Sequence, residues 1–438
     1  MKAGIVSLGC AKNQVDTEEM LYFLKLDGIE QTEDFFDADI LIVNTCGFIE
    51  SAKEQSIETI LNLAEYKITG KCELLCVTGC LSQRYATELS EEMPEIDLII
   101  GVSQYDILPK LIKQFMQNKN KTVDTERRVQ EKAQGRVLLT PPYSSYIRIA
   151  EGCNNRCSYC AIPLIRGNCV SRNEEDILSE MRSLAQKGVK EQILIAQDTT
   201  IYGRDLKNNA SLAQLLDKAA NIDGITWIRV LYCYPDETTK ELIDIMAKHK
   251  NICKYLDLPL QHASPKMLKL MNRRGSIEHI KDILNYARDK GFTLRTTFIV
   301  GFPEETEEDF EQLLSFVKEM RFDRLGAFTY SREEDTPSYD MENQVPESIK
   351  QERLDKLMRL QQEISLENNL KRIGQTLKVL VVGKDGDYYT ARSEFEAPDV
   401  DGIVYLKSSE NLREGQFIKA TIFKADTYDL YAESAGEA

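Results

Sequence analysis

The sequence of 438 residues predicts an α/β protein of three parts: a small parallel-sheet domain, a partial six-unit βα barrel and a small antiparallel β-barrel. Three observations lead to this prediction. Short apolar runs alternate with helical stretches up to about residue 135, and a β–α rhythm with glycine stops continues from about 140 to 345. Short strands broken by Gly and Asp turns then fill residues 374–438. We place the domains at 1–120, 139–370 and 373–438.

The first domain has the pattern of a parallel sheet. The runs AGIVSLG, DILIVNT, ELLCVTG and IDLIIG are almost wholly apolar, which is typical of strands covered on both faces. VDTEEMLYFLKLDG predicts a helix that ends at Gly28. The polar and charged stretch NKNKTVDTERRVQEKAQG follows, and we interpret it as a linker.

The second domain offers six strand candidates with helices between several of them. The candidates are YIRIAEG, QILIAQD, WIRVLY, YLDLPLQ, LRTTFIVG and LGAFTYS. Six βα-like units favour an incomplete barrel over the complete eight-fold one. A long connecting helix is predicted next, from PESIKQERLDKLMRLQQEISLENNLKRIG, and the strands after it suggest a small antiparallel barrel.

Composition narrows the possible functions. The net charge of -16 argues against a general nucleic-acid binder, because such proteins neutralise phosphates with a basic face. Three histidines leave little room for His-rich metal sites or a Ser-His-Asp enzyme. The N-terminus lacks signal-peptide features, and no apolar run is long enough for a bilayer, so we expect a cytoplasmic protein without a membrane partner. Eleven cysteines in such a chain indicate metal binding or catalysis.

The stretch EGCNNRCSYC places Cys153, Cys157 and Cys160 at C-x3-C-x2-C spacing. Three thiolates on a four-iron cluster leave one iron open, which is the mark of a catalytic metal rather than a structural one. The motif follows a barrel strand, where active-site loops are found. The alternative is a zinc site completed by a distant Cys or His. Tyr159 could stack on a base, or it could be an ordinary packing residue.

A second set of cysteines shares one local context. Cys10, Cys46 and Cys80 each lie just past a predicted strand. Because parallel strands end at one edge of a sheet, residues far apart in the chain could meet there in a second three-ligand site. Three unrelated core cysteines are the alternative. The other five we interpret as packing or incidental residues: Cys72, Cys76, Cys169, Cys233 and Cys253.

The first motif, with its aromatic residue, resembles the signature of the radical S-adenosylmethionine enzymes. The resemblance implies a 4Fe-4S cluster that binds S-adenosyl-L-methionine and cleaves it to a 5′-deoxyadenosyl radical. Thr297, Gly301 and Glu304 in TFIVGFPEE approximate the family's G-x-I-x-G-x-x-E pattern, with Thr at the first Gly, which places this strand against the adenine. Gln197 and Asp198 end ILIAQD, where the family holds the methionine end. A simple helix cap is the alternative for these two residues.

Longer blocks resemble the methylthiotransferase family across nearly the full chain. They are SLGCAKNQVDTE, NTCGFIESAKEQSIETI, EGCNNRCSYCAIPLIRG, YLDLPLQHASPKMLKLMNRRG and TTFIVGFPEETEEDF. The resemblance implies an auxiliary 4Fe-4S cluster on Cys10, Cys46 and Cys80, hence two clusters, a radical S-adenosylmethionine barrel and a C-terminal TRAM barrel. It assigns no catalytic residue beyond the cluster ligands. A low-potential electron donor such as flavodoxin or ferredoxin is also implied.

Within that family the opening SLGCAKNQVDTE and the stretch AQDTTIYGRD look like the branch that modifies an aspartate of ribosomal protein S-twelve. The resemblance implies hydrogen abstraction from the aspartate β-carbon and uptake of a methylthio group. A tRNA adenosine methylthiotransferase, a two-cluster electron carrier and a ribosome-binding module with structural zinc are the alternatives.

Charge in the last domain supports the ribosomal-protein branch. Residues 375–438 carry twelve acidic and seven basic side chains. An acidic barrel suits a basic ribosomal protein and argues against tRNA as the partner. Asp399 and Asp401 are our candidates for the substrate-binding face, and two turn residues before Gly402 are the alternative.

Overall fold

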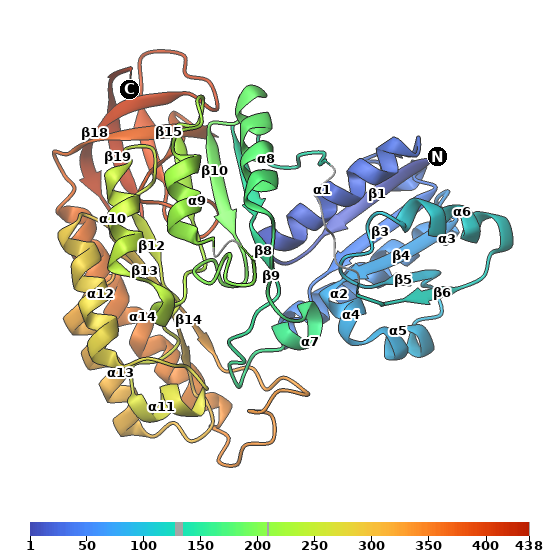
Figure 1. Cartoon of the computed structure of the whole chain (residues 1–438), viewed down its shortest axis with the longest axis horizontal. Coiled ribbons are helices and arrows are strands. Elements are labelled where there is room, and N and C mark those ends of the chain that lie inside the picture. Colours follow the sequence, from blue (N-terminus) through green and yellow to red (C-terminus); the bar gives the residue numbers. More distant parts are fainter. Residues whose placement is uncertain (128–134, 208–209, 438) are drawn as a thin grey trace. The chain divides into compact units, whose positions relative to one another are not determined.

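The computed structural model of the chain describes residues 1–127, 135–207 and 210–437. By its internal contacts the chain divides into two compact units (Figure 1). The first unit comprises Met1–Leu139, Ala150–Arg172 and Glu333–Thr336. The second comprises Thr140–Ile149, Asn173–Arg332 and Pro337–Ala438. The C-x3-C-x2-C segment therefore packs with the N-terminal residues.

The first unit is built on a parallel six-stranded sheet with the order β2-β1-β3-β4-β5-β6. Its strands are β1 (Lys2–Ser7), β2 (Glu30–Gln31), β3 (Ile40–Thr45), β4 (Leu74–Gly79), β5 (Leu98–Ile100) and β6 (Thr122–Asp124). The four apolar runs form β1, β3, β4 and β5, as predicted. The linker interpretation is wrong for β6, which pairs with β5 at the edge of the sheet and is too short and polar to show as an apolar run. Residues 128–134 of that stretch lie outside the described residues.

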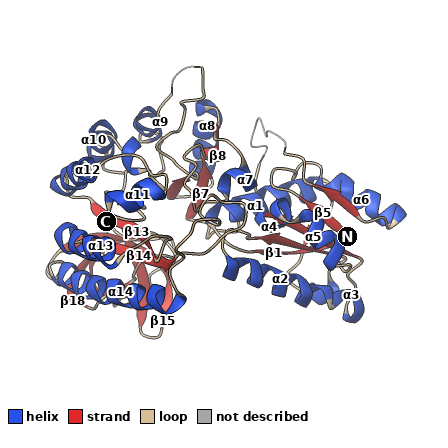
Figure 2. Ribbon diagram, turned by 90° about the horizontal axis from the view of Figure 1, so that it is seen from below, coloured by secondary structure: helices blue, strands red, loops and turns tan. Residues whose placement is uncertain are grey.

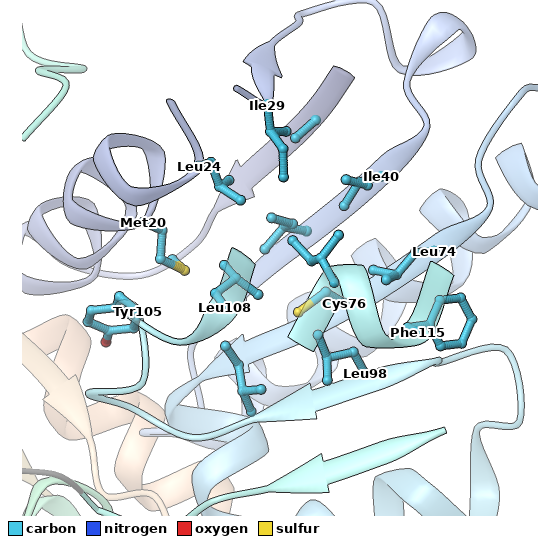
Figure 3. Packing of buried hydrophobic residues seen from close by; sticks show 14 residues of the cluster. Met20, Leu24, Ile29, Ile40, Leu74, Cys76, Leu98, Tyr105, Leu108 and Phe115 are labelled. Atoms are coloured by element: carbon cyan, nitrogen blue, oxygen red, sulfur yellow. The ribbon is translucent and has the colours of Figure 1, made fainter. Parts of the chain in front are cut away.

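Helices cover both faces of this sheet (Figure 2). They are α1 (Ala11–Leu26), α2 (Glu50–Ala64), α3 (Tyr66–Thr69), α4 (Cys80–Arg84), α5 (Ala86–Glu92) and α6 (Leu108–Asn118). Ile40 and Cys76 point to one face and pack in a cluster with Met20 of α1 and Leu108 of α6 (Figure 3). Leu41 and its alternate neighbours pack against α2 on the other face, because successive strand residues point to opposite sides.

The second unit contains the predicted partial barrel. Six parallel strands form two three-stranded sheets, β7-β10-β11 and β12-β13-β14. They are β7 (Ser144–Arg148), β10 (Glu191–Ile195), β11 (Trp227–Val230), β12 (Tyr255–Asp257), β13 (Thr293–Val300) and β14 (Arg324–Thr329). A parallel bridge between Ile228 and Ile252 connects the two sheets. The barrel helices are α8 (Glu174–Gln186), α9 (Leu212–Ala219), α10 (Lys240–Lys248), α12 (Ile277–Asp289) and α13 (Glu307–Met320).

The long helix α14 (Glu347–Leu370) leads into a closed five-stranded barrel of order β15-β16-β17-β19-β18. Its strands are β15 (Thr376–Asp385), β16 (Tyr388–Ser393), β17 (Val404–Lys407), β18 (Phe417–Ala425) and β19 (Leu430–Glu437). Four pairings are antiparallel as predicted, and β17 with β19 is parallel. No helix in the described part of the chain is long and apolar enough to cross a membrane.

Within the second unit, buried charges join the small barrel to the N-terminal ends of the βα-barrel strands. Glu191, the first residue of β10, contacts Arg392 of β16 at 2.6 Å and Arg229 of β11 at 3.3 Å. Burial by itself would raise the pKa of Glu191, but the two guanidinium groups lower it to about 2. Arg324, the first residue of β14, contacts Glu396 at 3.1 Å. The small barrel therefore covers the end of the βα barrel opposite its strand C-termini.

We predict that Arg392→Ala lowers the free energy of unfolding by about 3–5 kcal/mol at neutral pH, because it removes a partner from a fully buried carboxylate. The ion pair stabilises the fold above the ordinary pKa of Glu191, 4.5, and this contribution is lost as the pH falls toward 2. The difference in unfolding free energy between Arg392→Ala and the unmodified protein, measured by chemical denaturation, should therefore become smaller as the pH falls over that range.

The matched control is Lys240→Ala, which breaks the exposed ion pair between Lys240 and Asp282. An exposed pair contributes about 0–1 kcal/mol. An equal loss of stability in both variants would contradict the role given to the buried pair.

Candidate functional site

The C-x3-C-x2-C segment is a compact loop between β8 (Ala150–Glu151) and α7 (Ile162–Arg166). Its backbone holds it closed: the Cys153 N–H donates to the Gly167 carbonyl at 3.1 Å, and the Cys160 N–H donates to the Cys157 carbonyl at 3.0 Å. The Asn155 N–H points at the Cys153 Sγ, 3.5 Å away. The local fold therefore brings the three cysteines into one loop.

Gly152 and Tyr159 complete this loop. Gly152 has φ +77°, and a Cβ there would lie 2.2 Å from the Asn168 carbonyl oxygen, so only glycine fits without a shift of the chain. Tyr159 is half-buried in the turn just before Cys160. Cys157 is buried, while Cys153 and Cys160 are half-buried.

The N-terminal cysteines lie at one edge of the first unit's sheet. Cys10 comes directly before α1, Cys46 directly after β3, and Cys80 directly after β4. Since β1, β3 and β4 are adjacent and parallel, these positions share the C-terminal edge. A Cβ on Gly9 would lie 3.1 Å from the Cys46 Sγ, which places the Cys10 loop against Cys46. Burial raises the pKa of the Cys80 thiol to about 11, although the neighbouring Arg166 guanidinium acts in the opposite direction.

Asn13 organises all three N-terminal cysteine segments, and sequence reasoning missed it. Its Nδ2 donates to the Leu8 and Thr45 carbonyls, both at 2.9 Å, just before Cys10 and Cys46. The Cys80 Sγ lies 3.6 Å from the Asn13 Oδ1. The sequence signal that could have revealed it is the run of polar residues in AKNQVDTEEM directly after Cys10, which form the first turns of α1 and are buried in the structure.

Arg166, the last residue of α7, is also absent from the predicted site. Its Nη2 lies 2.8 Å from Asp16 Oδ2 and donates to Asn13 Oδ1 at 2.7 Å and to Cys80 Sγ at 3.5 Å. Its Nη1 lies 3.1 Å from Glu151 Oε1. The guanidinium thus joins the loop of Cys153 to the segment of Cys80 within the first unit.

Both cysteine sets have the donors that iron–sulfur clusters require, since each supplies three soft thiols. None of the eleven cysteines, all in the described ranges, forms a disulfide. Among the described residues, no three Cys, His, Asp or Glu side chains converge as ligands of a single metal ion. The thiolates of a four-iron cluster bind separate irons, so they stand further apart than the ligands of one ion.

Two of the residues expected to bind S-adenosylmethionine follow β10. Asp198 is buried, and its Oδ1 accepts the Thr200 N–H at 3.0 Å. This contact closes a turn and is not the helix cap considered as the alternative, because residues 197–207 form bends and turns and α9 begins at Leu212. Gln197 is half-buried at the same strand end. Both lie at the C-terminal end of the βα barrel, opposite the small barrel.

The strand β13 carries the others. Burial alternates along it: Phe298 and Val300 are fully buried, whereas Thr297 and Ile299 on the opposite face are half-buried. Phe298 packs on Phe322, so Thr297 faces away from this contact.

The turn after β13 contains Gly301 and Glu304. Gly301 has φ +72°, and a Cβ there would lie 2.2 Å from Lys350 Cγ. Glu304 accepts a hydrogen bond from Asn343 Nδ2 at 2.7 Å. The adjacent Glu305, which was not predicted, accepts the Gly301 and Phe302 N–H groups and so closes this turn.

The two aspartates proposed for substrate binding differ. Asp401 accepts the Tyr255 hydroxyl at 2.6 Å, its side chain is 2% exposed, and burial raises its pKa. These contacts favour a structural role between the two barrels rather than contact with a partner. Asp399 is exposed, has φ +66°, and accepts a hydrogen bond from the Tyr146 hydroxyl at 3.3 Å.

Three family models match successive parts of the chain. Residues 2–101 match "Uncharacterized protein family UPF0004", residues 147–317 match the radical SAM superfamily, and residues 373–434 match the TRAM domain. Among solved structures, the radical S-adenosylmethionine methyltransferase TsrM from Kitasatospora setae covers 88% of this chain and 79% of its own, with a TM-score of 0.58 at 14% identity. That likeness shows the fold alone.

Curated relatives match over the full length. "Ribosomal protein uS12 methylthiotransferase RimO" of Acetivibrio thermocellus is 49% identical over 100% of this chain and 99% of its own. The proteins of the same name from Pelotomaculum thermopropionicum and Clostridioides difficile are 50% and 48% identical, each over 99% of this chain and at least 98% of their own. Likeness of this extent shows that the chain belongs to the family of ribosomal protein uS12 methylthiotransferases.

Proposed function

We propose that this enzyme adds a methylthio group to the β-carbon of an aspartate in ribosomal protein S-twelve by radical S-adenosylmethionine chemistry. One observation carries the proposal: a second cysteine triad gathers at one sheet edge, in the same compact unit as the C-x3-C-x2-C loop. The full-length relatives support this substrate, because they are named as methylthiotransferases of ribosomal protein uS12.

In this proposal Cys153, Cys157 and Cys160 hold one 4Fe-4S cluster and Cys10, Cys46 and Cys80 hold another. When bound, the clusters and S-adenosyl-L-methionine supply the electron, the radical and the methylthio group, which no side chain could supply. The chain's own part is to present three thiolates at each site, to leave one position open, and to hold the segments in place through Asn13.

Six residues would hold S-adenosyl-L-methionine: Tyr159, Gln197, Asp198, Thr297, Gly301 and Glu304. Tyr159 would stack on the adenine, and Thr297 and Gly301 would line the strand beside it. Gln197, Asp198 and Glu304 would supply polar groups at strand ends. Asp198 would act together with Thr200, because its Oδ1 already accepts the Thr200 N–H.

The substrate is proposed to be a basic protein recognised by the acidic C-terminal barrel, with Asp399 on the contacting face. The buried Asp401 would hold that face in place through Tyr255. A low-potential donor such as flavodoxin or ferredoxin would supply electrons, and the enzyme would work in the cytoplasm.

We predict that anaerobically reconstituted protein adds a methylthio group to a peptide from ribosomal protein S-twelve, detected by mass spectrometry. Cys10→Ala should abolish this product but retain S-adenosylmethionine cleavage, because the C-x3-C-x2-C loop remains intact. A methylthio mark on tRNA and none on the peptide would contradict the proposed substrate.

Iron and sulfide content gives an independent test. The intact protein should bind roughly eight of each per chain, the content of about two four-iron clusters. Replacement of Cys10, Cys46 and Cys80 by Ala together should reduce this to about four.

Cys76→Ala is the matched control, because Cys76 is a fully buried core residue of the same domain. It should keep the full iron content. Unchanged iron in the triple variant would show that the N-terminal cysteines hold no cluster.

A further inference from the structure

Arg166 carries a buried positive charge at the N-terminal cysteine site. Its side chain is only 2% exposed, and that of its partner Asp16 is fully buried. Asp16 and Asn13 belong to α1, and Glu151 to β8, so three contacts fix one guanidinium between two segments. A buried arginine held this firmly has little freedom to turn away from its neighbours.

One of those neighbours is the sulfur of Cys80. The Arg166 Nη2 donates to the Cys80 Sγ at 3.5 Å. Hydrogen bonds to the sulfurs of an iron–sulfur cluster and the net charge nearby are two of the properties that set its reduction potential. A positive charge stabilises the reduced cluster, which carries the additional electron, and a negative charge destabilises it.

We infer that Arg166 is a positioning residue that orients Cys80 and raises the reduction potential of the auxiliary cluster, and that Asp16 limits this increase. The inference rests on the proposed function, since it assumes a cluster on Cys10, Cys46 and Cys80. It goes beyond that function because it assigns a role to residues outside both cysteine motifs. Arg166 ends the short helix α7 that follows the C-x3-C-x2-C loop, so the same residue also connects the two cysteine segments.

The two members of the pair have opposite expected effects. Arg166→Gln removes the positive charge and leaves the buried Asp16 carboxylate without its partner, so the potential should become more negative. Asp16→Asn removes the negative charge and keeps the guanidinium, so the potential should become more positive. A purely structural disturbance would lower cluster occupancy in both variants and would not reverse the sign.

The test isolates the auxiliary cluster in the full-length chain. Cys153, Cys157 and Cys160 are replaced by Ala, the protein is reconstituted anaerobically, and the potential of the remaining cluster is measured by an EPR-monitored redox titration. Arg166→Gln and Asp16→Asn are then made in this background. Arg166→Lys keeps the positive charge. Its potential should therefore lie between that of Arg166→Gln and that of the background protein.

Arg136→Gln is the matched control. Arg136 forms a buried ion pair at 3.0 Å with Glu18, which lies on α1 as Asp16 does. Its replacement should leave the potential of the auxiliary cluster unchanged while it costs comparable stability in thermal unfolding.

The outcomes separate the two proposals. If the background protein binds no iron, the auxiliary cluster of the proposed function is wrong. If the cluster forms and its potential is unchanged in both variants, or moves the same way in both, the role of Arg166 is wrong. If either variant fails to fold, the other still decides, because each has its own predicted direction.

Discussion

The side-chain amide of Asn13 is the contact on which the candidate site depends. It donates to the carbonyls just before Cys10 and Cys46, and its oxygen faces Cys80 and Arg166. Parallel strands deliver the cysteines to one edge, but strand order alone does not set the distances between loops. A single buried amide with both of its groups engaged sets them, and its partners come from four separate segments of the chain.

Buried ion pairs also hold separate segments of the chain together in both units. Glu191, Arg229 and Arg392 form a network in the second unit, and Asp16 and Arg166 form one in the first. Removing one member of such a network leaves an uncompensated charge in the interior, which is strongly destabilising. These networks therefore specify one arrangement of loops and barrels, whereas apolar packing alone would tolerate small shifts.

The layered architecture could be predicted because apolar runs, glycine stops and polar turns report directly on strands and helices. The edge strand β6 was not predicted, because it is short and polar and pairs with only one neighbouring strand, β5. Arg166 and Asn13 were not predicted for a different reason. Each makes its contacts with residues distant in the chain, and from sequence alone a polar residue near a helix end cannot be distinguished from a solvent-exposed one. Asp401 resembled an exposed turn residue before a glycine, and only the packing of the small barrel buries it.

The small barrel closes one end of the βα barrel, and S-adenosylmethionine is expected at the other end. The buried ion pairs and the Tyr255–Asp401 hydrogen bond join the small barrel to the strand N-termini, which are the far end from the strand C-termini. If the small barrel binds the substrate as proposed, substitutions on its exposed surface would alter which macromolecule is captured and would leave the strand C-termini of the βα barrel unchanged. A lineage could exchange one class of substrate for another by changing charge on this appended domain, while the radical chemistry is inherited intact.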